Sequence, residues 1–353
     1  MFNPRSPKQV KELFYGKLRM KPVISRKTHA PTTDEKALQS LRVKYPQHEK
    51  VISLMMEHRE KAKLLDSFLG SKLSADGRLV TSYNGAGTVT GRLTSQKTIF
   101  GYGANVQQTP RGTFRKMFIA PKGKKLIKID LSQADARAVA WFAQITPLVE
   151  RFLTPEFDIH SWTASLFYGK PENEITKEER TRAKGIVHGV NYGRGPISIS
   201  KSENIPVSQV RQSIRYYKSA LPQLEIWHER IKAEICRCRR LVTPFGRLRI
   251  FMGRLDDGLF RSAYAYLPQS IVADIVNKAF YILKDIMPEG CYVLLQVHDE
   301  LVIEAPDRYV EKCCMLAKKE FELPIMIPPI KQPLVIPSVV EVGDNWYDVK
   351  GIK

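Results

Sequence analysis

The chain has 353 residues, of which 43% are apolar and 26% charged, and its formal net charge is +20 at pH 7. These values describe a globular protein with one elaborate domain or two, and so large an excess of Lys and Arg favours a polyanionic partner. No apolar run approaches the roughly 18 to 20 residues that span a bilayer, and no signal-peptide pattern opens the chain. The five cysteines lack zinc-site spacing, so we expect free thiols, a cytoplasmic location and no membrane partner.

The N-terminal region predicts basic helices. A first helix is expected over residues 6–18 with Ser6 as its cap, and Thr32 with Glu35 has the spacing of a capping box that opens a second helix. A longer helix over residues 49–69 is crowded with Lys and Arg. These charges fit a solvated face and a nucleic-acid backbone about equally.

Residues 81–95 are rich in small and hydroxyl side chains, and residues 105–110 add amides. Small residues let the backbone approach a ligand closely, and Arg92 supplies a charge among them. The segment is not a P-loop, because no Gly-Lys-Ser/Thr is present. Asn105 and Gln107 carry amides that can contact base edges, although alone they indicate only a polar loop.

A carboxylate ends the strand predicted over residues 125–130. The Ala-rich run that follows Asp130 is a strong helix former. Asp130 therefore lies where a strand gives way to a helix, which is a common place for a catalytic carboxylate.

Residues 292–304 predict a hairpin, with two β-branched runs on either side of His298, Asp299 and Glu300. The strand before the tip has no polar alternation, so we expect it to be buried on both faces. By itself the tip could be an ordinary charged turn. If this hairpin neighbours the strand of Asp130, three carboxylates converge and can hold two divalent ions about 3.5–4 Å apart for phosphoryl transfer.

A stripe of cations and rings is predicted on the helix over residues 177–192. Its members are four residues apart and so share one broad helix face: Arg180, Lys184, His188 and Tyr192. Two cations and two rings suit a nucleoside triphosphate. A solvated basic face is the alternative, but the rest of the helix is apolar, which favours a cleft. His160 could add a contact, although alone it is more typical of a structural residue.

Two further features lie downstream. An Arg-rich cluster spans residues 237–249, with a turn at residues 243–246. Residues 261–285 then predict a long helix on which Arg261 and Gln269 lie two turns apart.

The ordered set of motifs resembles the DNA polymerase I family (family A) over nearly the whole chain. Residues 130–137 resemble its motif A, residues 180–193 its motif B and residues 297–301 its motif C. The segments that resemble the part holding the primer–template are residues 90–95 and 105–110. Residues 340–346 resemble the family's C-terminal ending, and Arg261 and Gln269 match a helix on the template side.

The resemblance implies an α+β fold of right-hand architecture, with an antiparallel sheet as the palm and mostly helical fingers. The implied parts are the foot of the thumb and entry to the palm (1–89), palm with motif A (90–144), fingers with motif B (145–252) and palm with motif C (253–353). Most of the thumb and any exonuclease domain are expected to be missing. We expect a truncated or split gene whose remainder is a separate polypeptide, or an excised fragment.

The resemblance also implies a role for each site residue. Asp130 and Asp299 ligate two Mg²⁺ ions, which Mn²⁺ can replace, and Glu300 lies just outside them. The residues implied to bind a deoxynucleoside triphosphate are Arg180, Lys184, His188, Tyr192, Asp135, Gln133 and His160, and Lys184 is also implied to protonate the pyrophosphate. The residues implied to contact primer–template DNA are Arg92, Asn105, Gln107, Arg261, Gln269 and His298. The implied activity is template-dependent 5′–3′ DNA synthesis without proofreading, near the nucleoid of a bacterial or phage-infected cell.

Two positions depart from the family pattern. Asp135 stands where Glu usually packs under the sugar and excludes ribonucleotides, so we hypothesise weaker exclusion unless a neighbour compensates. His188 stands where Phe or Tyr is usual, at a position tied to dideoxynucleotide acceptance. Because a His side chain is smaller and titrates between roughly pH 5.5 and 8, we hypothesise altered sugar selection and a pH-dependent nucleotide affinity.

Two other functions stay open from the sequence. A single-subunit RNA polymerase has the same palm architecture, and Asp135, in place of the usual Glu, is compatible with this alternative. Residues 90–95 and 297–301 favour a DNA polymerase. A catalytically dead nucleic-acid-binding protein would have lost a metal carboxylate or Lys184, and none is lost. Replication, repair and phage propagation all stay open as biological roles.

Overall fold

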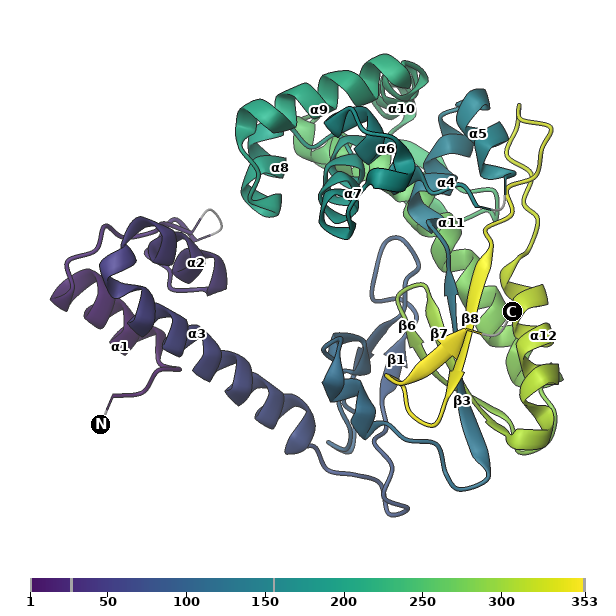
Figure 1. The fold of residues 1–353 in the computed structure, drawn as a ribbon, viewed down its shortest axis with the longest axis horizontal. Helices are drawn as coiled ribbons and strands as arrows, with labels where there is room; N and C mark the ends of the chain where they lie inside the picture. The colour runs from purple at the N-terminus through teal and green to yellow at the C-terminus, as the bar shows by residue number, and fades with distance from the viewer. Residues whose placement is uncertain (1, 26–27, 155, 352–353) are drawn as a thin grey trace. The chain divides into compact units, whose positions relative to one another are not determined.

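The computed structural model describes residues 2–25, 28–154 and 156–351, and the chain divides into two compact units (Figure 1). The first unit comprises Met1–Ser82 and Ser95–Asn105. The second comprises Tyr83–Thr94 and Val106–Lys353. Each unit is described by itself.

The first unit is helical. Its helices are α1 (Pro7–Lys11), which continues as a π-helical turn (Glu12–Lys17), α2 (Glu35–Lys44) and α3 (Glu49–Leu64), which ends in a second π-helical turn (Leu65–Leu69). They enclose a small core that includes Phe14, Leu38 and Ile52, each at most 1% exposed. Ser6 caps α1 by accepting a hydrogen bond from Gln9 N, as predicted.

The predicted capping box of α2 is wrong. Asp34, not Thr32, caps this helix, and its carboxylate accepts a hydrogen bond from Ala37 N at 2.9 Å. The hydroxyl of Thr32 instead lies 3.2 Å from Asp34 Oδ2. A carboxylate at the cap is favoured by the partial positive charge of the helix N-terminus, so the acid one residue before the helix takes the role.

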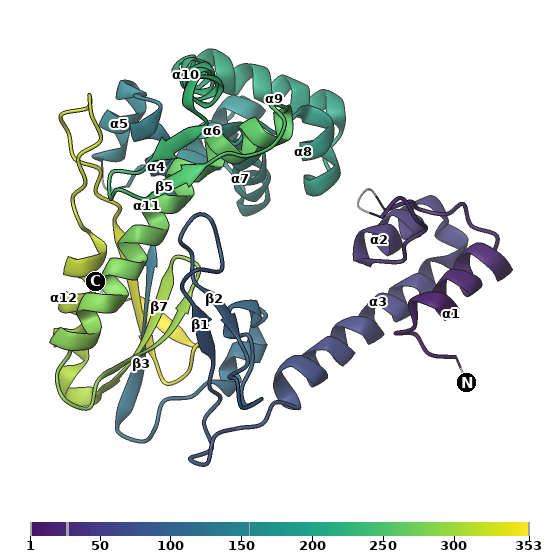
Figure 2. The ribbon, with the colours of Figure 1, turned by 180° about the vertical axis from the view of Figure 1, so that it is seen from behind.

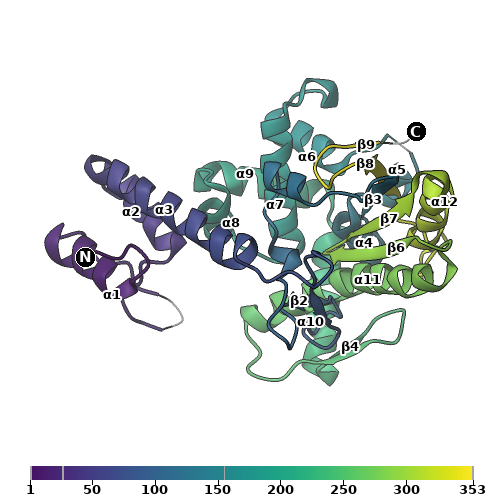
Figure 3. The same ribbon diagram turned by 90° about the horizontal axis from the view of Figure 1, so that it is seen from below.

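A five-stranded antiparallel sheet organises the second unit (Figure 3), and its strand order is β6-β7-β3-β8-β9. The strands are β3 (Lys124–Leu131), β6 (Tyr292–Val297), β7 (Glu300–Pro306), β8 (Ser338–Gly343) and β9 (Val349–Gly351). The central strand β3 buries Ile127 and Ile129 completely. The chain also forms the short strands β1 (Ser82–Asn84) and β2 (Thr94–Gln96).

The predicted hairpin is present as β6 and β7, but one expectation about it is wrong. Val293, Leu294 and Leu295 are only half-buried, whereas an unalternating apolar run suggested burial on both faces. The reason is position: β6 is an edge strand, and its pairing with β7 is interrupted by a bulge between Val293 and Leu295. Edge strands have one open side.

Two helices cover one face of the sheet: α11 (Asp257–Ile286) and α12 (Val310–Phe321). Figure 2 shows α11 running along the sheet and on into the helical part of the unit. Pro268 lies inside α11. The buried residues of α11 join the sheet core to the helical core, so both parts share one apolar cluster.

The helical part of the second unit is continuous in sequence between β3 and α11. Its elements are α4 (Ala134–Phe142), α5 (Thr146–Phe152), α6 (Ile159–Tyr168), α7 (Lys177–Asn191), α8 (Pro196–Glu203), α9 (Val207–Ala220), α10 (Gln223–Cys238), β4 (Arg240–Val242) and β5 (Leu248–Ile250). The predicted turn at residues 243–246 joins β4 to β5. The predicted α+β class, an antiparallel sheet beside a mostly helical part, is confirmed. No helix in the described ranges combines the length and apolarity that a bilayer crossing needs.

Close packing at Gly343 generates a prediction about the C-terminal edge of the sheet. A Cβ on Gly343 would lie 2.2 Å from the backbone oxygen of Asp348, so Gly343→Ala must force β8 and β9 apart. We expect a lower thermal unfolding midpoint, from overpacking that costs about 1–3 kcal/mol. Gly351→Ala is the matched control, because no described atom lies within 4 Å of its Cβ position. Equal midpoints for the two variants would contradict the packing argument.

Candidate functional site

The pairing of β3 with β7 brings the predicted carboxylates together. Asp130 pairs with Glu300 across the two strands, and Leu131 N donates to Asp299 O over 3.4 Å. His298, at the hairpin tip, has φ +60°, a left-handed conformation that permits so short a turn. Asp130 and Asp299 thus lie at adjoining ends of neighbouring strands.

Asp130 is in an unfavourable setting for a negative charge. Burial, then the neighbouring charge of Asp299 and then that of Glu300, raises the pKa of Asp130 from 3.8 to about 7, against opposing effects of Lys128 and Arg111. Like charges that share a site favour protonation of one of them. This site is therefore one that a cation would stabilise.

Glu300 is placed differently from the two aspartates. Its Oε1 accepts a hydrogen bond from Trp346 Nε1 at 2.6 Å and lies 3.4 Å from Arg115 Nη1. Its side chain does not line the cavity described below. The backbone of Glu300 therefore lies beside Asp130, while its carboxylate is bound by Trp346 and Arg115.

Helix α7 carries the predicted cationic stripe, and both of its ends are fixed. At its start, the hydroxyl of Thr176 accepts from Glu179 N, and Glu179 Oε2 accepts from Thr176 N, which is a complete capping box. At its end, Tyr217 donates to Asn191 Oδ1 at 3.0 Å, and His228 Nε2 lies 2.9 Å from Asn191 O. The C-terminal end of α7 is thus bonded to both α9 and α10.

The carboxylates and the stripe line one cavity of about 320 Å³. The predicted residues that line it are Asp130, Gln133, Asp135, His160, Arg180, Lys184, His188, Tyr192 and Asp299. They come from β3, the β6–β7 hairpin and helices α4, α6 and α7, with Gln133 just before α4. Residues far apart in the chain therefore form one concave site with acids and cations on its walls.

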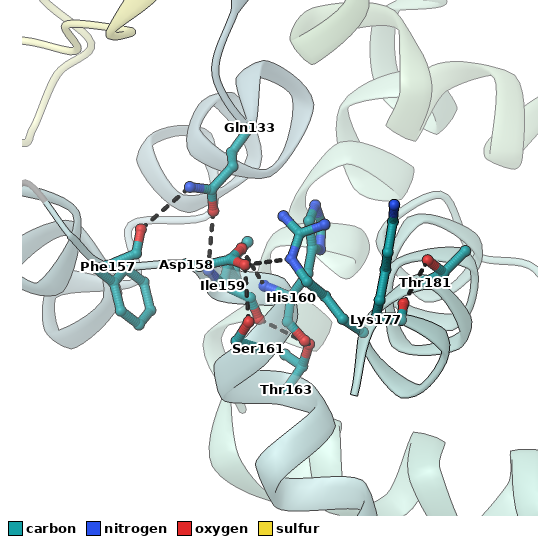
Figure 4. A network of polar contacts seen from close by, with 10 residues as sticks. Gln133, Phe157, Asp158, Ile159, His160, Ser161, Thr163, Lys177 and Thr181 are labelled. Atoms are coloured by element: carbon teal, nitrogen blue, oxygen red, sulfur yellow. Dashed lines mark hydrogen bonds and ion pairs between the residues drawn. The ribbon is translucent and has the colours of Figure 1, made fainter. Parts of the chain in front are cut away.

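A polar network ties the start of α4 to the start of α6 (Figure 4). Gln133 donates to Phe157 O at 3.1 Å and accepts from Ile159 N at 2.9 Å, so both ends of its amide are used within the chain. Asp158 caps α6 and pairs with Arg180 Nε. Arg180 is thereby directed by an acid from the neighbouring helix.

Asp135 and His188 face each other across the cavity from α4 and α7. His188 Nε2 lies 3.6 Å from Asp135 Oδ2, and Arg92 Nη2 lies 3.9 Å from Asp135 Oδ1. Burial raises the pKa of Asp135, but the neighbouring imidazole of His188 and the charge of Arg92 outweigh it, so the net pKa is lowered. The rings of His188 and Tyr192 meet edge to face at 4.8 Å.

Three buried polar atoms at the cavity meet no hydrogen-bond partner among the described residues: Asp135 Oδ1, the Tyr192 hydroxyl and His160 Nδ1. Buried polar atoms without partners are costly. Burial also lowers the pKa of His160 to about 4, so its ring is neutral at pH 7. These atoms indicate that the cavity is built for a polar ligand.

The donor set is a pair of carboxylates rather than a metal cage. Among the residues that the structure describes, no three His, Cys, Asp or Glu side chains are grouped closely enough to hold a metal ion. Mg²⁺ is usually held by one or two carboxylates, waters and the phosphates of a substrate rather than by an all-protein cage. Asp130 and Asp299, with their mutual repulsion, fit a divalent ion that arrives with a phosphate ligand.

The residues predicted to contact DNA are dispersed. Asn105 belongs to the first unit, where its Oδ1 accepts from Ser95 at 2.5 Å. Gln107 donates to Leu93 O at 3.0 Å and to Gln296 O at 3.3 Å. The structure therefore shows internal bonds for both amides.

The remaining predicted DNA contacts lie in the second unit. Arg92 pairs with Asp135, Arg261 and His298 are exposed, and Gln269 is half-buried. These four side chains are not among those that line the cavity.

Sequence reasoning missed several site residues. Asp158, which orients Arg180, and Arg111, which lines the cavity, were not singled out. Arg115 and Trp346, which bind Glu300, were missed as well. An Asp immediately before a helix is a recognisable cap signal, so Asp158 could have been found, whereas the others depend on long-range contacts.

Known proteins place the chain in a family. The family model for DNA polymerase family A matches residues 1–348, and the chain belongs to that family. It is 30% identical over 370 residues to the thermostable DNA polymerase I of Thermus thermophilus and 31% identical over 367 residues to DNA polymerase I of Pseudomonas aeruginosa. These alignments cover 99% and 98% of this chain but 42% and 38% of those proteins, so the chain spans less than half of their length.

A solved structure agrees with this assignment. The POL domain of Pol1 from M. smegmatis, in complex with DNA primer-template and dNTP, is similar with a TM-score of 0.81 and 26% identity, covering 98% of this chain and 61% of that one. The predicted family and fold class are confirmed.

The raised pKa of Asp130 generates a pH prediction for the protein in chelator. Because this pKa is about 7 when folded and 3.8 ordinarily, the folded state retains a proton that the unfolded chain releases. The contribution of Asp130 to stability is therefore fully present below about pH 4 and lost as the pH rises through about 7. We expect Asp130→Asn to remove this part of the slope in the thermal midpoint against pH.

The exposed Asp285 provides the control, since Asp285→Asn should keep the wild-type slope. Identical slopes for wild type and Asp130→Asn between about pH 5 and 8 would show that Asp130 does not titrate there.

Proposed function

We propose that this chain is a DNA-directed DNA polymerase that adds deoxynucleotides to a primer 3′-hydroxyl in the 5′–3′ direction. The observation that carries the proposal is one cavity lined both by Asp130 and Asp299 and by Arg180 and Lys184. Family membership supports it, as does a related domain solved with primer-template and dNTP. The net charge of +20 suits a polyanionic substrate.

The chain's own groups bind and orient the triphosphate. Arg180, directed by Asp158, and Lys184, one turn along α7, present cations to its phosphates. Lys184 also lines the cavity, and we propose that it donates a proton to the departing pyrophosphate. Positioning and charge supply most of the catalysis, because phosphoryl transfer needs little covalent help from protein.

The carboxylates that line the same cavity suit Mg²⁺. Asp130 and Asp299 would hold the ions, and Mn²⁺, with similar oxygen preference, could replace them. When bound, such ions lower the pKa of an attacking hydroxyl and neutralise charge on the phosphates. Without such ions the two aspartates repel each other, and burial removes Asp130 from the water that would stabilise its negative charge.

The sugar pocket would be shared by Asp135, His188 and Tyr192. His188 reaches Asp135 at 3.6 Å, so a ring on α7 partly fills the space left by a side chain one methylene shorter than Glu. Asp135 Oδ1 remains without a hydrogen-bond donor among the described residues. A buried acceptor of this kind can bind a sugar hydroxyl, which favours weaker rejection of ribonucleotides.

Primer extension by the purified chain tests the proposed function. We expect extension on a DNA template with Mg²⁺ and none in chelator, because the aspartates need a cation to accept the phosphates. Asp130→Asn and Asp299→Asn should each abolish extension, a loss of at least about 10³-fold in rate, while primer–template binding measured by fluorescence anisotropy persists.

Asp285→Asn, an exposed substitution on α11, should extend like wild type. Normal extension by either Asp130→Asn or Asp299→Asn would remove the site assignment. Extension with ribonucleotides alone would favour the RNA polymerase-like alternative.

Sugar selection is tested by Asp135→Glu. We expect the longer side chain to raise discrimination against ribonucleotides by about tenfold or more, roughly what one well-placed contact of 1.4 kcal/mol supplies. The measurement is the ratio of kcat/KM for matched deoxy- and ribonucleotides. Wild-type discrimination equal to that of Asp135→Glu would refute the weakened exclusion.

The hypothesis that His188 makes nucleotide affinity depend on pH is tested separately. Nucleotide affinity of wild type and of His188→Phe is measured from about pH 5.5 to 8, where imidazoles titrate. A flat wild-type affinity over that range would contradict a role for His188 titration.

A further inference from the structure

A buried arginine and a buried tryptophan hold the carboxylate of Glu300. Trp346 Nε1 donates to Glu300 Oε1 at 2.6 Å, and Arg115 Nη1 lies 3.4 Å from the same oxygen. The guanidinium carbon of Arg115 lies 3.9 Å from the centre of the Trp346 ring. The exposed fractions of Glu300, Arg115 and Trp346 are 8%, 8% and 2%. We call this trio the Glu300 clamp.

The clamp is rigid because its two donors come from segments that are bonded to each other. Trp346 N donates to Phe118 O at 3.0 Å, and Ala120 N donates to Asp344 O at 2.8 Å. The ring of Phe118 meets that of Trp346 edge to face at 5.4 Å. The segment around Trp346 is therefore bonded to the segment that precedes β3, and both segments contact Glu300 at the start of β7.

The clamp decides where the third carboxylate of the site points. Glu300 pairs with Asp130 in the sheet and directly follows Asp299. A free carboxylate at this position could turn toward the two aspartates. Hydrogen bonds from an indole N–H and a guanidinium to a buried carboxylate are costly to lose, so both donors keep Glu300 out of the cavity that Asp130 and Asp299 line.

We propose that Trp346 is a positioning residue that, together with Arg115, limits the divalent-ion site to two carboxylates. The inference rests on the proposed function, since it concerns the same site. Affinity for divalent ions rises with the number of charged ligands. Two carboxylates leave coordination positions for nucleotide phosphates and let ions exchange, whereas a third would bind the ion more tightly and compete with the nucleotide.

Trp346→Phe tests the proposal, because it removes the N–H donor and keeps a ring for Arg115. The readout is Mn²⁺ binding to the DNA-free and nucleotide-free protein, followed by the electron paramagnetic resonance of free Mn²⁺. We expect about tenfold tighter Mn²⁺ binding than in wild type, as a released Glu300 joins the two aspartates. Adding Glu300→Gln to Trp346→Phe should return the affinity to near the wild-type value.

Trp141→Phe is the matched control. Trp141 is 1% exposed, and its Nε1 donates to Gln332 O at 2.9 Å, so this variant also loses one buried indole hydrogen bond. It should lower the thermal midpoint about as much as Trp346→Phe and leave Mn²⁺ binding unchanged. Unchanged or weaker Mn²⁺ binding in a folded Trp346→Phe would overturn the proposal.

Glu300→Gln alone keeps the proposal testable if Trp346→Phe does not fold. With the clamp residues in place, we expect Mn²⁺ affinity to change little, because Glu300 is not a ligand. A loss of about tenfold, as expected for removal of a ligand, would overturn the proposal. The Mn²⁺ titration needs no turnover, so the two proposals can fail separately. A wild type that binds Mn²⁺ but does not extend primers would contradict the proposed function and would not contradict the role of the Glu300 clamp.

Discussion

The antiparallel pairing of β3 with β7 is the constraint on which the site depends. Its register sets Asp130 opposite Glu300 and brings Asp299 within one backbone hydrogen bond of Leu131. A shift of one residue would turn these side chains to the other face of the sheet. The fully buried Ile127 and Ile129 hold that register, because slippage would expose them. Packing of the core thus positions the acids.

The acids are held close at an electrostatic cost. Burial and two neighbouring carboxylates bring the pKa of Asp130 to about 7, and the Glu300 clamp neutralises only one of the neighbours. A site of this kind is poorly satisfied by the protein's own groups and is improved by a cation. Buried atoms of Asp135, Tyr192 and His160, which meet no hydrogen-bond partner among the described residues, indicate that the site also suits a polar ligand.

The cations opposite the acids are held by helix packing. The capping box at Thr176 and the contacts of Asn191 fix both ends of α7, and its buried residues join the same apolar cluster as α11 and the sheet. Arg180 pairs with Asp158, which caps a different helix. The capped ends of α7 and its packing in the core therefore place the backbone that carries these cations, and Asp158 pairs with the side chain of Arg180.

The sequence by itself determined the local features of this protein. Short apolar and β-branched runs predicted the strand at Asp130 and the hairpin at Asp299, and the four-residue spacing of cations and rings predicted the stripe on α7. The order of the motifs indicated the family. The sequence failed where a choice depended on neighbours in space: the cap at Asp34 and the half-burial of the edge strand β6. Only the tertiary structure decided which elements are adjacent, since the strand order and the contact of Trp346 with Glu300 join residues far apart in the chain. Sequence patterns record each residue's preferences, whereas burial, pairing and pKa arise from the groups that folding brings beside it.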